Sequence, residues 1–201
     1  MRVADTLSLS RIAFAPVWTA VYFLSFNFEQ SRWIILSVLL VVLSLVELTD
    51  FLDGYAARKL NQVSDIGKLL DPFCDTILHI SIFLCFTVTR LMPAVVFLLI
   101  MWREFGMLFI RMVCIKNGTA IAARAGGKIK TVLYITSVFC ALVCDIIRSV
   151  FTAGTFELQF HISADVLQIT CTILFTLCAV AAYVSFIDYL IHFKKTISKS
   201  V

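Results

Sequence analysis

Four aspartates in an otherwise apolar sequence are the residues whose type and spacing could do chemistry. Asp50 and Asp53 are three residues apart, and Asp71 and Asp75 are four residues apart. Carboxylates gathered in one place repel one another and are costly beside hydrocarbon unless a cation compensates them. Oxygen-only ligands select hard divalent ions such as Mg²⁺, Mn²⁺ or Ca²⁺. Four carboxylates can hold a pair of such ions, and a two-metal site suits displacement at phosphorus.

Two helices are expected to position these aspartates. On the first helix, three residues share a side with Asp50 and Asp53 through i, i+3 and i, i+4 relations: Gly54, Ala57 and Arg58. On the second helix, Gly67 begins a stripe that Asp71 and Asp75 continue at i+4 and i+8. Small residues beside the carboxylates let a partner helix or a ligand come close. Joined by a turn within residues 61–65, the two helices would be antiparallel neighbours.

The rest of the chain is apolar enough for an integral membrane protein. Of its 201 residues, 61% are hydrophobic and 15% are charged, whereas about a quarter are charged in a soluble domain. Six blocks approach the length of a membrane span, and they lack the alternation of a lipid-facing barrel: 11–28, 33–52, 69–89, 92–115, 131–151 and 166–191. The expected fold is all-α, with six transmembrane helices in a single domain, residues 1–201. Residues 1–10 are expected to form a short amphipathic segment on the membrane surface.

Lysines and arginines are unevenly distributed between the two sides of this topology. With six spans both termini share one side, and twelve cations lie there: Arg2, Arg11, Arg58, Lys59, Lys68, Lys116, Arg124, Lys128, Lys130, Lys194, Lys195 and Lys199. The other side has Arg32, Arg90 and Arg148. The positive-inside rule therefore predicts that both termini and the acidic motif face the cytoplasm, in a cytoplasmic (inner) membrane.

The acidic motif resembles the signature of a known enzyme family. The sequence reads Asp50-x-x-Asp53-Gly54-x-x-Ala57-Arg58, then eight residues, then Gly67-x-x-x-Asp71-x-x-x-Asp75. All eight positions match the signature of the CDP-alcohol phosphatidyltransferases, and six spans with the motif on the second and third also resemble that family. The resemblance implies transfer of a phosphatidyl group from a CDP-linked donor to an alcohol, with release of CMP.

The resemblance also implies roles for individual residues. Two divalent cations, Mg²⁺ or Mn²⁺, would be held by the four aspartates, and Asp75 would also act as the base that takes the proton of the acceptor hydroxyl. The cytidine diphosphate site would be lined by the remaining signature residues and the first two acids: Asp50, Asp53, Gly54, Ala57, Arg58 and Gly67.

The segment 102–131 is similar to the corresponding region of phosphatidylglycerophosphate synthases, a branch of this family. The matching positions are Arg103, Glu104, Arg111, Gly127, Lys128, Lys130 and Thr131, and the start of the chain, "LSLSRIAFAP", resembles their N-terminal segment. This resemblance implies CDP-diacylglycerol as donor and glycerol 3-phosphate as acceptor. Arg103 and Arg111 lie inside a span, where cations usually face a polar interior. An acceptor with its own phosphate would need cations beyond the metals, and the candidates to bind it are Arg103, Arg111, Lys128 and Lys130. Alternatively, Arg103 pairs with Glu104 or Glu47.

Other interpretations remain open at this stage. The chain reads Cys74-Asp75-Thr76 where these synthases often have Ala-Asp-Lys, and His79 is either a partner of Asp75 or a packed side chain. Cardiolipin synthase, which uses phosphatidylglycerol, and phosphatidylinositol-phosphate or choline-type transferases are the rivals within the family. A small cation-coupled transporter is the rival from another class, although it would need acids near the bilayer midplane. By family analogy, a homodimer is also possible.

Overall fold

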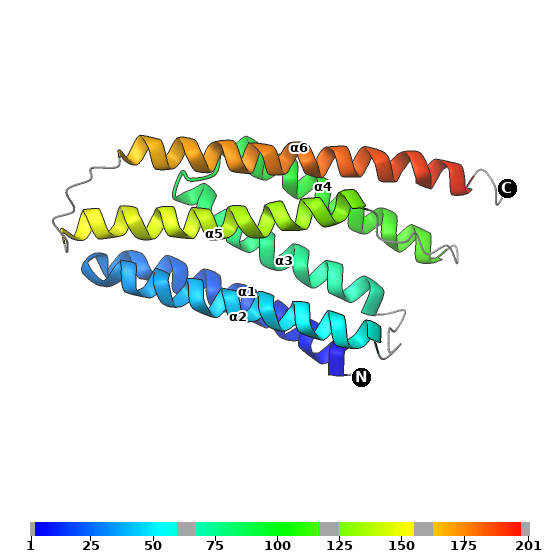
Figure 1. The fold of residues 1–201 in the computed structure, drawn as a ribbon, viewed down its shortest axis with the longest axis horizontal. Coiled ribbons are helices and arrows are strands. Elements are labelled where there is room, and N and C mark those ends of the chain that lie inside the picture. The colour runs from blue at the N-terminus through cyan, green and yellow to red at the C-terminus, as the bar shows by residue number, and fades with distance from the viewer. Residues whose placement is uncertain (1–2, 60–66, 117–124, 155–162, 198–201) are drawn as a thin grey trace.

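The computed structural model describes residues 3–59, 67–116, 125–154 and 163–197, with side chains for residues 10–49, 70–115, 127, 129–154 and 163–191. These residues form six α-helices and no strand (Figure 1), which confirms the all-helical prediction for this part of the chain: α1 Val3–Leu24, α2 Arg32–Lys59, α3 Gly67–Val88, α4 Ala94–Lys116, α5 Ala125–Ala153 and α6 Ala164–Ile197. Two short 3-10 turns, Ser25–Asn27 and Glu29–Ser31, connect α1 to α2.

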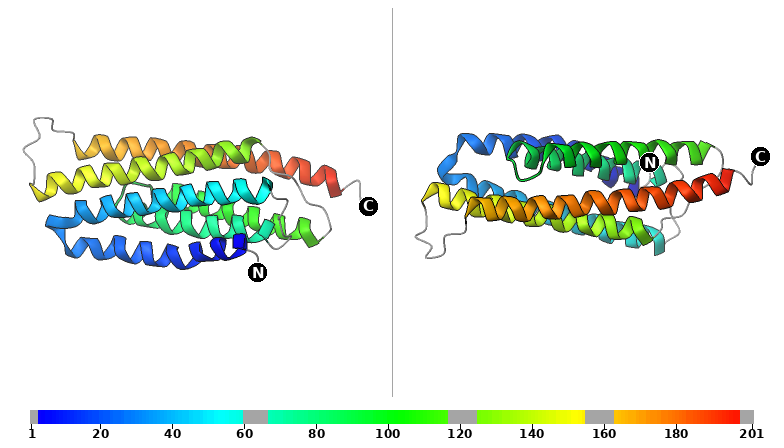
Figure 2. Two further views of the ribbon diagram at one scale, coloured as in Figure 1. Left: turned by 60° about the horizontal axis from the view of Figure 1, so that its bottom comes forward. Right: turned by 90° about the horizontal axis from the view of Figure 1, so that it is seen from above.

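The helices form a closed ring in which each one packs on two neighbours. The order around the ring is α1, α3, α4, α6, α5 and α2, and α3 also touches α5 across the middle. Successive helices run in alternating directions, so α2 ends and α3 begins at the same end of the bundle (Figures 1 and 2). We call this the motif end and the opposite one the far end. The start of α1 and the end of α6 also lie at the motif end.

The order of the ring separates the two helices of the acidic motif. α2 and α3 are antiparallel, as expected, but over the described residues they have no pair of Cα atoms within 8 Å. Helix α1 contacts both of them. Trp18 donates its indole N–H to the backbone oxygen of Leu39 on α2 at 3.4 Å, and Tyr22 packs edge-on against Phe86 of α3. The direct α2–α3 contact that the sequence suggested is therefore replaced, in this part of the chain, by contacts through α1.

Helix boundaries differ from the expected spans mainly in length. α1 runs without a break from Val3, through Pro16, to Leu24, so the segment expected on the membrane surface and the first expected span form one helix. The backbone of α2 stays helical to Lys59, past Gly54, as the motif requires. The turn expected at residues 61–65 lies outside the described residues. α3 ends at Val88. Two residues later Arg90 has a left-handed φ of 62°, and the N–H of Leu91 turns back to donate to the oxygen of Phe86 at 2.9 Å.

Much of the outer surface is apolar. On α2 alone, five exposed side chains follow one another at intervals of three or four residues: Ile34, Val38, Val41, Leu45 and Leu48. A continuous apolar stripe that faces outward is typical of a helix in lipid and atypical of a soluble bundle.

Four helical segments are long and apolar enough to cross a membrane, judged by length and composition over the described residues: Glu29–Thr49, Leu70–Val88, Ile129–Ala153 and Ala164–Ile191. The six-span count is therefore not confirmed. Helix α4 contains Arg103, Glu104 and Arg111, whose charges lower its apolar character.

Candidate functional site

The first turns of α3 carry the second half of the acidic motif. Asp71 is exposed, and the side chain of Asp75, one turn further along, is 46% exposed. One more turn into the bundle, the ring nitrogen Nδ1 of His79 lies 2.9 Å from the backbone oxygen of Asp75. The His79 ring also packs against Phe83 and Tyr134. His79 is therefore a packed side chain whose ring contacts the backbone of Asp75, and its role as a partner of the Asp75 carboxylate stays a prediction.

Arg11 of α1 forms an ion pair with the carboxylate of Asp75. Only 7% of Arg11 is exposed, so this guanidinium is buried beside a half-exposed acid. The sequence indicated Arg11 only as a cation of the cytoplasmic side and missed this partner. A signal was available, since a charged side chain inside an apolar helix is a functional candidate by default.

Glu47 of α2 adds a third charged group to this region. It is half-buried, one turn before Asp50, and it interacts electrostatically with His79, Asp75 and Arg11. Charged side chains of α1, α2 and α3 therefore come together at the motif end.

The remaining signature positions lie on helices at the same end, but only their backbone is described. Gly67 begins α3. The other five are in the last part of α2: Asp50, Asp53, Gly54, Ala57 and Arg58. Among residues with described side chains, no group of three or more His, Cys, Asp or Glu gathers in a metal-binding arrangement. The described side chains include only two of the four motif aspartates, Asp71 and Asp75. The described donors fit a hard cation in chemistry, because Asp71 and Asp75 offer oxygens only. The four-aspartate site stays a prediction.

A second charged cluster lies between α4, α5 and α6, and we call it the Glu104 cluster: Arg103, Glu104, Lys130 and Tyr134. One carboxylate oxygen of Glu104, Oε1, accepts hydrogen bonds from Arg103 at 2.8 Å, Lys130 at 2.8 Å and Tyr134 at 2.9 Å. Arg103 also donates its Nε–H to the backbone oxygen of Ala182 on α6 at 3.0 Å. Arg103, Glu104 and Tyr134 are each at most 6% exposed. The sequence left open whether Arg103 binds the acceptor phosphate or pairs with Glu104, and the structure shows the pair with Glu104.

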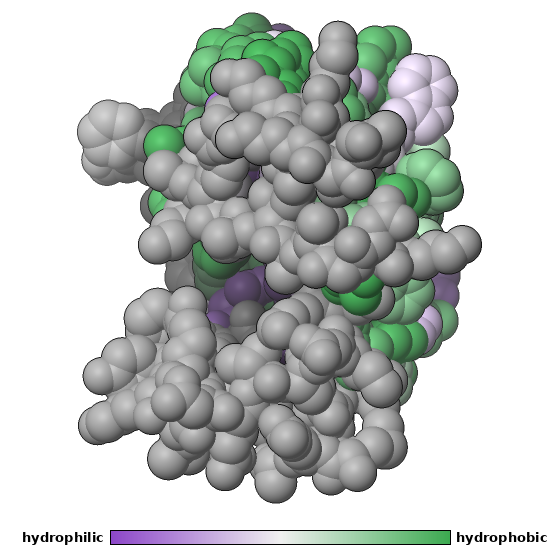
Figure 3. All heavy atoms as spheres, turned by 90° about the vertical axis from the view of Figure 1, so that its right-hand side faces the viewer, coloured by the Kyte–Doolittle hydropathy of each residue, from purple (hydrophilic) through white to green (hydrophobic). Residues whose placement is uncertain are grey.

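Arg111 is close enough to both charged regions for their charges to act on it. It lies eight residues after Arg103 on α4, nearer the motif end, and interacts electrostatically with Arg103, Glu104 and Asp75. Lys130 in turn interacts electrostatically with Arg111. Lys128 is on the first turns of α5, and its side chain lies outside the described set. Seen from the motif end, hydrophilic atoms of the described residues are visible near the middle of the molecule, and the described residues at its outline are largely apolar (Figure 3).

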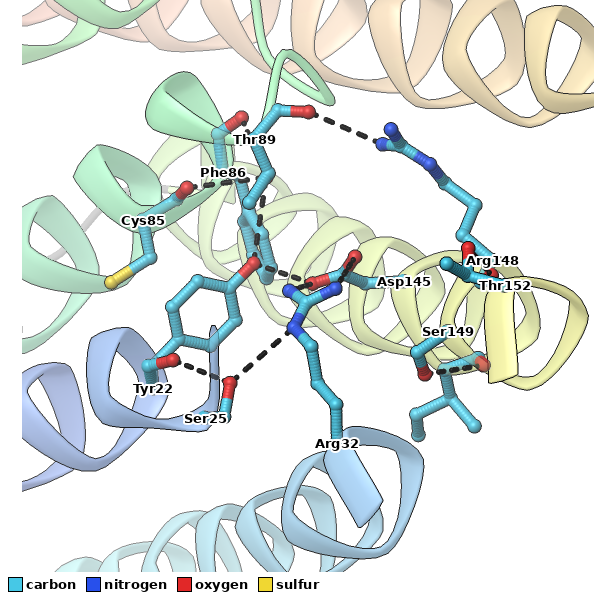
Figure 4. Close-up of polar contacts among 11 residues, drawn as sticks. Tyr22, Ser25, Arg32, Cys85, Phe86, Thr89, Asp145, Arg148, Ser149 and Thr152 are labelled. Atoms are coloured by element: carbon cyan, nitrogen blue, oxygen red, sulfur yellow. Dashed lines mark hydrogen bonds and ion pairs between the residues drawn. The ribbon is translucent and has the colours of Figure 1, made fainter. Parts of the chain in front are cut away.

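A separate polar network lies at the far end (Figure 4). Asp145 of α5, 1% exposed, accepts a hydrogen bond from the Tyr22 hydroxyl at 2.5 Å and from Arg32 Nη2 at 2.8 Å. Arg148 donates to the backbone oxygen of Thr89 at 3.2 Å, and the Tyr22 hydroxyl is 3.4 Å from the Thr89 hydroxyl. These contacts join α1, α2, α5 and the end of α3 far from the motif. The sequence had classed Arg32 and Arg148 only by membrane side.

Known proteins are similar to this chain over most of its length. Residues 1–185 match the family model described as CDP-alcohol phosphatidyltransferase. A Treponema pallidum protein named CDP-diacylglycerol–glycerol-3-phosphate 3-phosphatidyltransferase is 35% identical over 166 residues, which cover 77% of this chain and 74% of that protein. A Bacillus subtilis protein of the same name is 31% identical over 145 residues, covering 69% and 75%. A Streptomyces coelicolor protein named cardiolipin synthase (CMP-forming) is 32% identical over 106 residues, covering 52% and 47%.

Proposed function

Because the chain belongs to the CDP-alcohol phosphatidyltransferase family, we propose that it transfers the phosphatidyl group of CDP-diacylglycerol to glycerol 3-phosphate, giving phosphatidylglycerophosphate and CMP. The observation that carries this proposal is that Arg111 lies within electrostatic range of both Asp75 of the motif and Glu104. This supports a site in which a carboxylate activates a hydroxyl and nearby cations bind a phosphate. Glycerol 3-phosphate carries both groups, and the two relatives with the greatest coverage quoted above are named for this acceptor.

The proposed reaction is a displacement at phosphorus. The acceptor oxygen forms a bond to the phosphatidyl phosphorus, the bond from that phosphorus to the CMP oxygen breaks, and Asp75 takes the hydroxyl proton. Two Mg²⁺ or Mn²⁺ ions held by Asp50, Asp53, Asp71 and Asp75 would supply charge neutralisation for the diphosphate when bound. Gly54, Ala57, Arg58 and Gly67 would line the cytidine diphosphate site. Arg11 contributes positive charge beside Asp75.

For the acceptor phosphate we propose direct contacts from Arg111, Lys128 and Lys130. Their cationic side chains would bind a phosphate monoester by charge-assisted hydrogen bonds. Arg103 is bonded to Glu104 and to the Ala182 oxygen, so it contributes to the positive field and supports its neighbours.

We further propose six spans, with both termini and the site facing the cytoplasm in the inner membrane. Support comes from the alternating directions of the helices, from the start of α1 and the end of α6 lying at the motif end, and from the cations concentrated on that side. The acyl chains of the donor then stay in the bilayer while its diphosphate reaches the motif.

The first test is CMP release by the purified protein with CDP-diacylglycerol and Mg²⁺ or Mn²⁺. We expect release with glycerol 3-phosphate and background rates with glycerol, choline or inositol phosphate. Chelation of the metal should stop the reaction, and metal should restore it. Release with phosphatidylglycerol in place of glycerol 3-phosphate would instead support cardiolipin synthesis, which the Streptomyces coelicolor relative favours as the second candidate. Ion flux without CMP release would support a transporter.

Arg111→Ala is expected to weaken acceptor use selectively. Loss of a charge-assisted hydrogen bond to phosphate should raise the KM for glycerol 3-phosphate by about tenfold or more. The KM for CDP-diacylglycerol should change less than about twofold, because the proposed cytidine site is formed by α2 and the start of α3, whereas Arg111 is on α4. Steady-state kinetics with each substrate varied in turn would measure both constants, and an unchanged acceptor KM would remove Arg111 from the acceptor site.

A further inference from the structure

Glu104 is a buried carboxylate surrounded by donors from two helices. It is 6% exposed, and its Oε1 accepts hydrogen bonds from Arg103, Lys130 and Tyr134. Burying a carboxylate is costly unless it is paired and hydrogen-bonded, and this one is satisfied on both counts. Tyr134 and Lys130 lie four residues apart on α5, so Glu104 of α4 binds two successive turns of that helix.

The Lys130 side chain is held in place by these contacts. It is 16% exposed, donates to Glu104 at 2.8 Å, and lies over the Tyr134 ring with its Nζ 4.6 Å from the ring centroid. A lysine has a long flexible side chain, and fixing it costs up to about 2 kcal/mol of rotamer entropy. A lysine fixed before the ligand arrives binds an anion without losing that freedom during binding.

Glu104 also balances charge within the cluster. Arg103 is buried beside it, and Lys130 interacts unfavourably with both Arg103 and Arg111. Without the carboxylate, three cations would repel one another in a poorly solvated place. The more mobile lysine would then move away from Arg103, because Arg103 is also held by the Ala182 oxygen.

We infer that Glu104 is a positioning residue for the acceptor phosphate, which acts by holding the Lys130 ammonium group in the site. This inference rests on the proposed function, in which Lys130 contacts the phosphate of glycerol 3-phosphate. Glu104 touches neither substrate in this arrangement. Its effect on the reaction therefore passes through Lys130.

A double-mutant cycle tests that dependence. Glu104→Gln keeps the shape and removes the charge, and Lys130→Met keeps the length and removes the ammonium group. Each single variant is expected to raise the KM for glycerol 3-phosphate by about tenfold. In the Lys130→Met background, Glu104→Gln should change that KM less than about twofold, since its target is already gone. The KM for CDP-diacylglycerol should stay within about twofold throughout.

A matched control removes a buried polar contact elsewhere between α5 and α6. Ser137 is 2% exposed, its hydroxyl lies 3.0 Å from the Cys178 sulfur, and it is two turns beyond Lys130. Ser137→Ala should leave both KM values within about twofold of the original protein. If Glu104→Gln does not fold, Glu104→Asp can replace it, because aspartate keeps the charge but has a shorter side chain. It should raise the acceptor KM by a smaller factor, and this rise should also disappear in the Lys130→Met background.

The outcomes separate this inference from the proposed function. If the original protein releases no CMP with glycerol 3-phosphate, the proposed function fails before any variant is compared. If it does, multiplicative effects of the two substitutions, or equal changes in the KM for both substrates, would show that Glu104 only stabilises the fold and would overturn its positioning role.

Discussion

Asp75→Asn is expected to reduce CMP release by about a thousandfold or more, because one substitution removes both a proposed metal ligand and the proposed base. An asparagine has nearly the same shape but cannot take the hydroxyl proton. The protein should still fold, since the Asp75 side chain is 46% exposed and an asparagine oxygen at this position can still accept a hydrogen bond from Arg11. CMP release and thermal unfolding measured on the same purified sample would show loss of activity with a retained folding transition.

Asp71→Asn should have a similar effect on turnover through loss of a metal ligand. The matched control is Asp165→Asn, which changes an exposed aspartate in the first turn of α6 at the far end. This control should retain activity within about twofold, as expected for a distant and independent site. Near-normal turnover in either motif variant would show that the assigned roles are wrong.

Asp145→Asn is expected to destabilise the protein by about 3–5 kcal/mol while leaving the chemistry of the folded molecules intact. Asp145 is 1% exposed and receives Arg32 and the Tyr22 hydroxyl, so the substitution leaves a largely buried guanidinium without its carboxylate. Thermal unfolding in detergent would measure the loss. Activity per folded molecule, measured below the transition, should stay within about twofold because the network is at the far end.

A paired substitution sharpens this expectation. Replacing both partners, Arg32→Leu with Asp145→Leu, should recover much of the stability lost by Asp145→Asn, because two apolar side chains leave no isolated charge. If the free energy of unfolding of Asp145→Asn equalled that of the exposed control Asp165→Asn, the buried ion pair would contribute little to stability.

The sequence predicted local features of the fold well, because they depend on local patterns. Long apolar blocks predicted the helices, and the spacing of the motif required α2 to continue past Gly54, as it does. The joining of residues from distant segments was not predictable in this way. Arg11 and Asp75 are 64 positions apart, and Tyr22 and Asp145 are 123 apart. Such pairs depend on the order of helices around the ring, which no single segment specifies.

A direct α2–α3 contact was a reasonable expectation from a short connection, whereas in the part of the chain that the structure describes α1 contacts both helices instead. Trp18 of α1 donates to the backbone of α2, and Tyr22 of α1 packs on Phe86 of α3. For the same reason Arg11, on α1, reaches Asp75. The Glu104 cluster was only partly anticipated, because the neighbouring Arg103 and Glu104 suggested a pair, whereas Lys130 and Tyr134 join them from another helix.

The charged residues of α4 have a consequence for how the chain enters a membrane during synthesis. In the proposed six-span topology, a helix containing Arg103, Glu104 and Arg111 is costly to place in lipid alone, by about 2.5–3.5 kcal/mol for each central charge on insertion scales. Its partners arrive later, because Lys130 and Tyr134 belong to α5 and the Ala182 oxygen to α6. Helix α4 would therefore be retained beside the insertion machinery until α5 and α6 emerge, so that the last three helices leave for the lipid as one assembled unit.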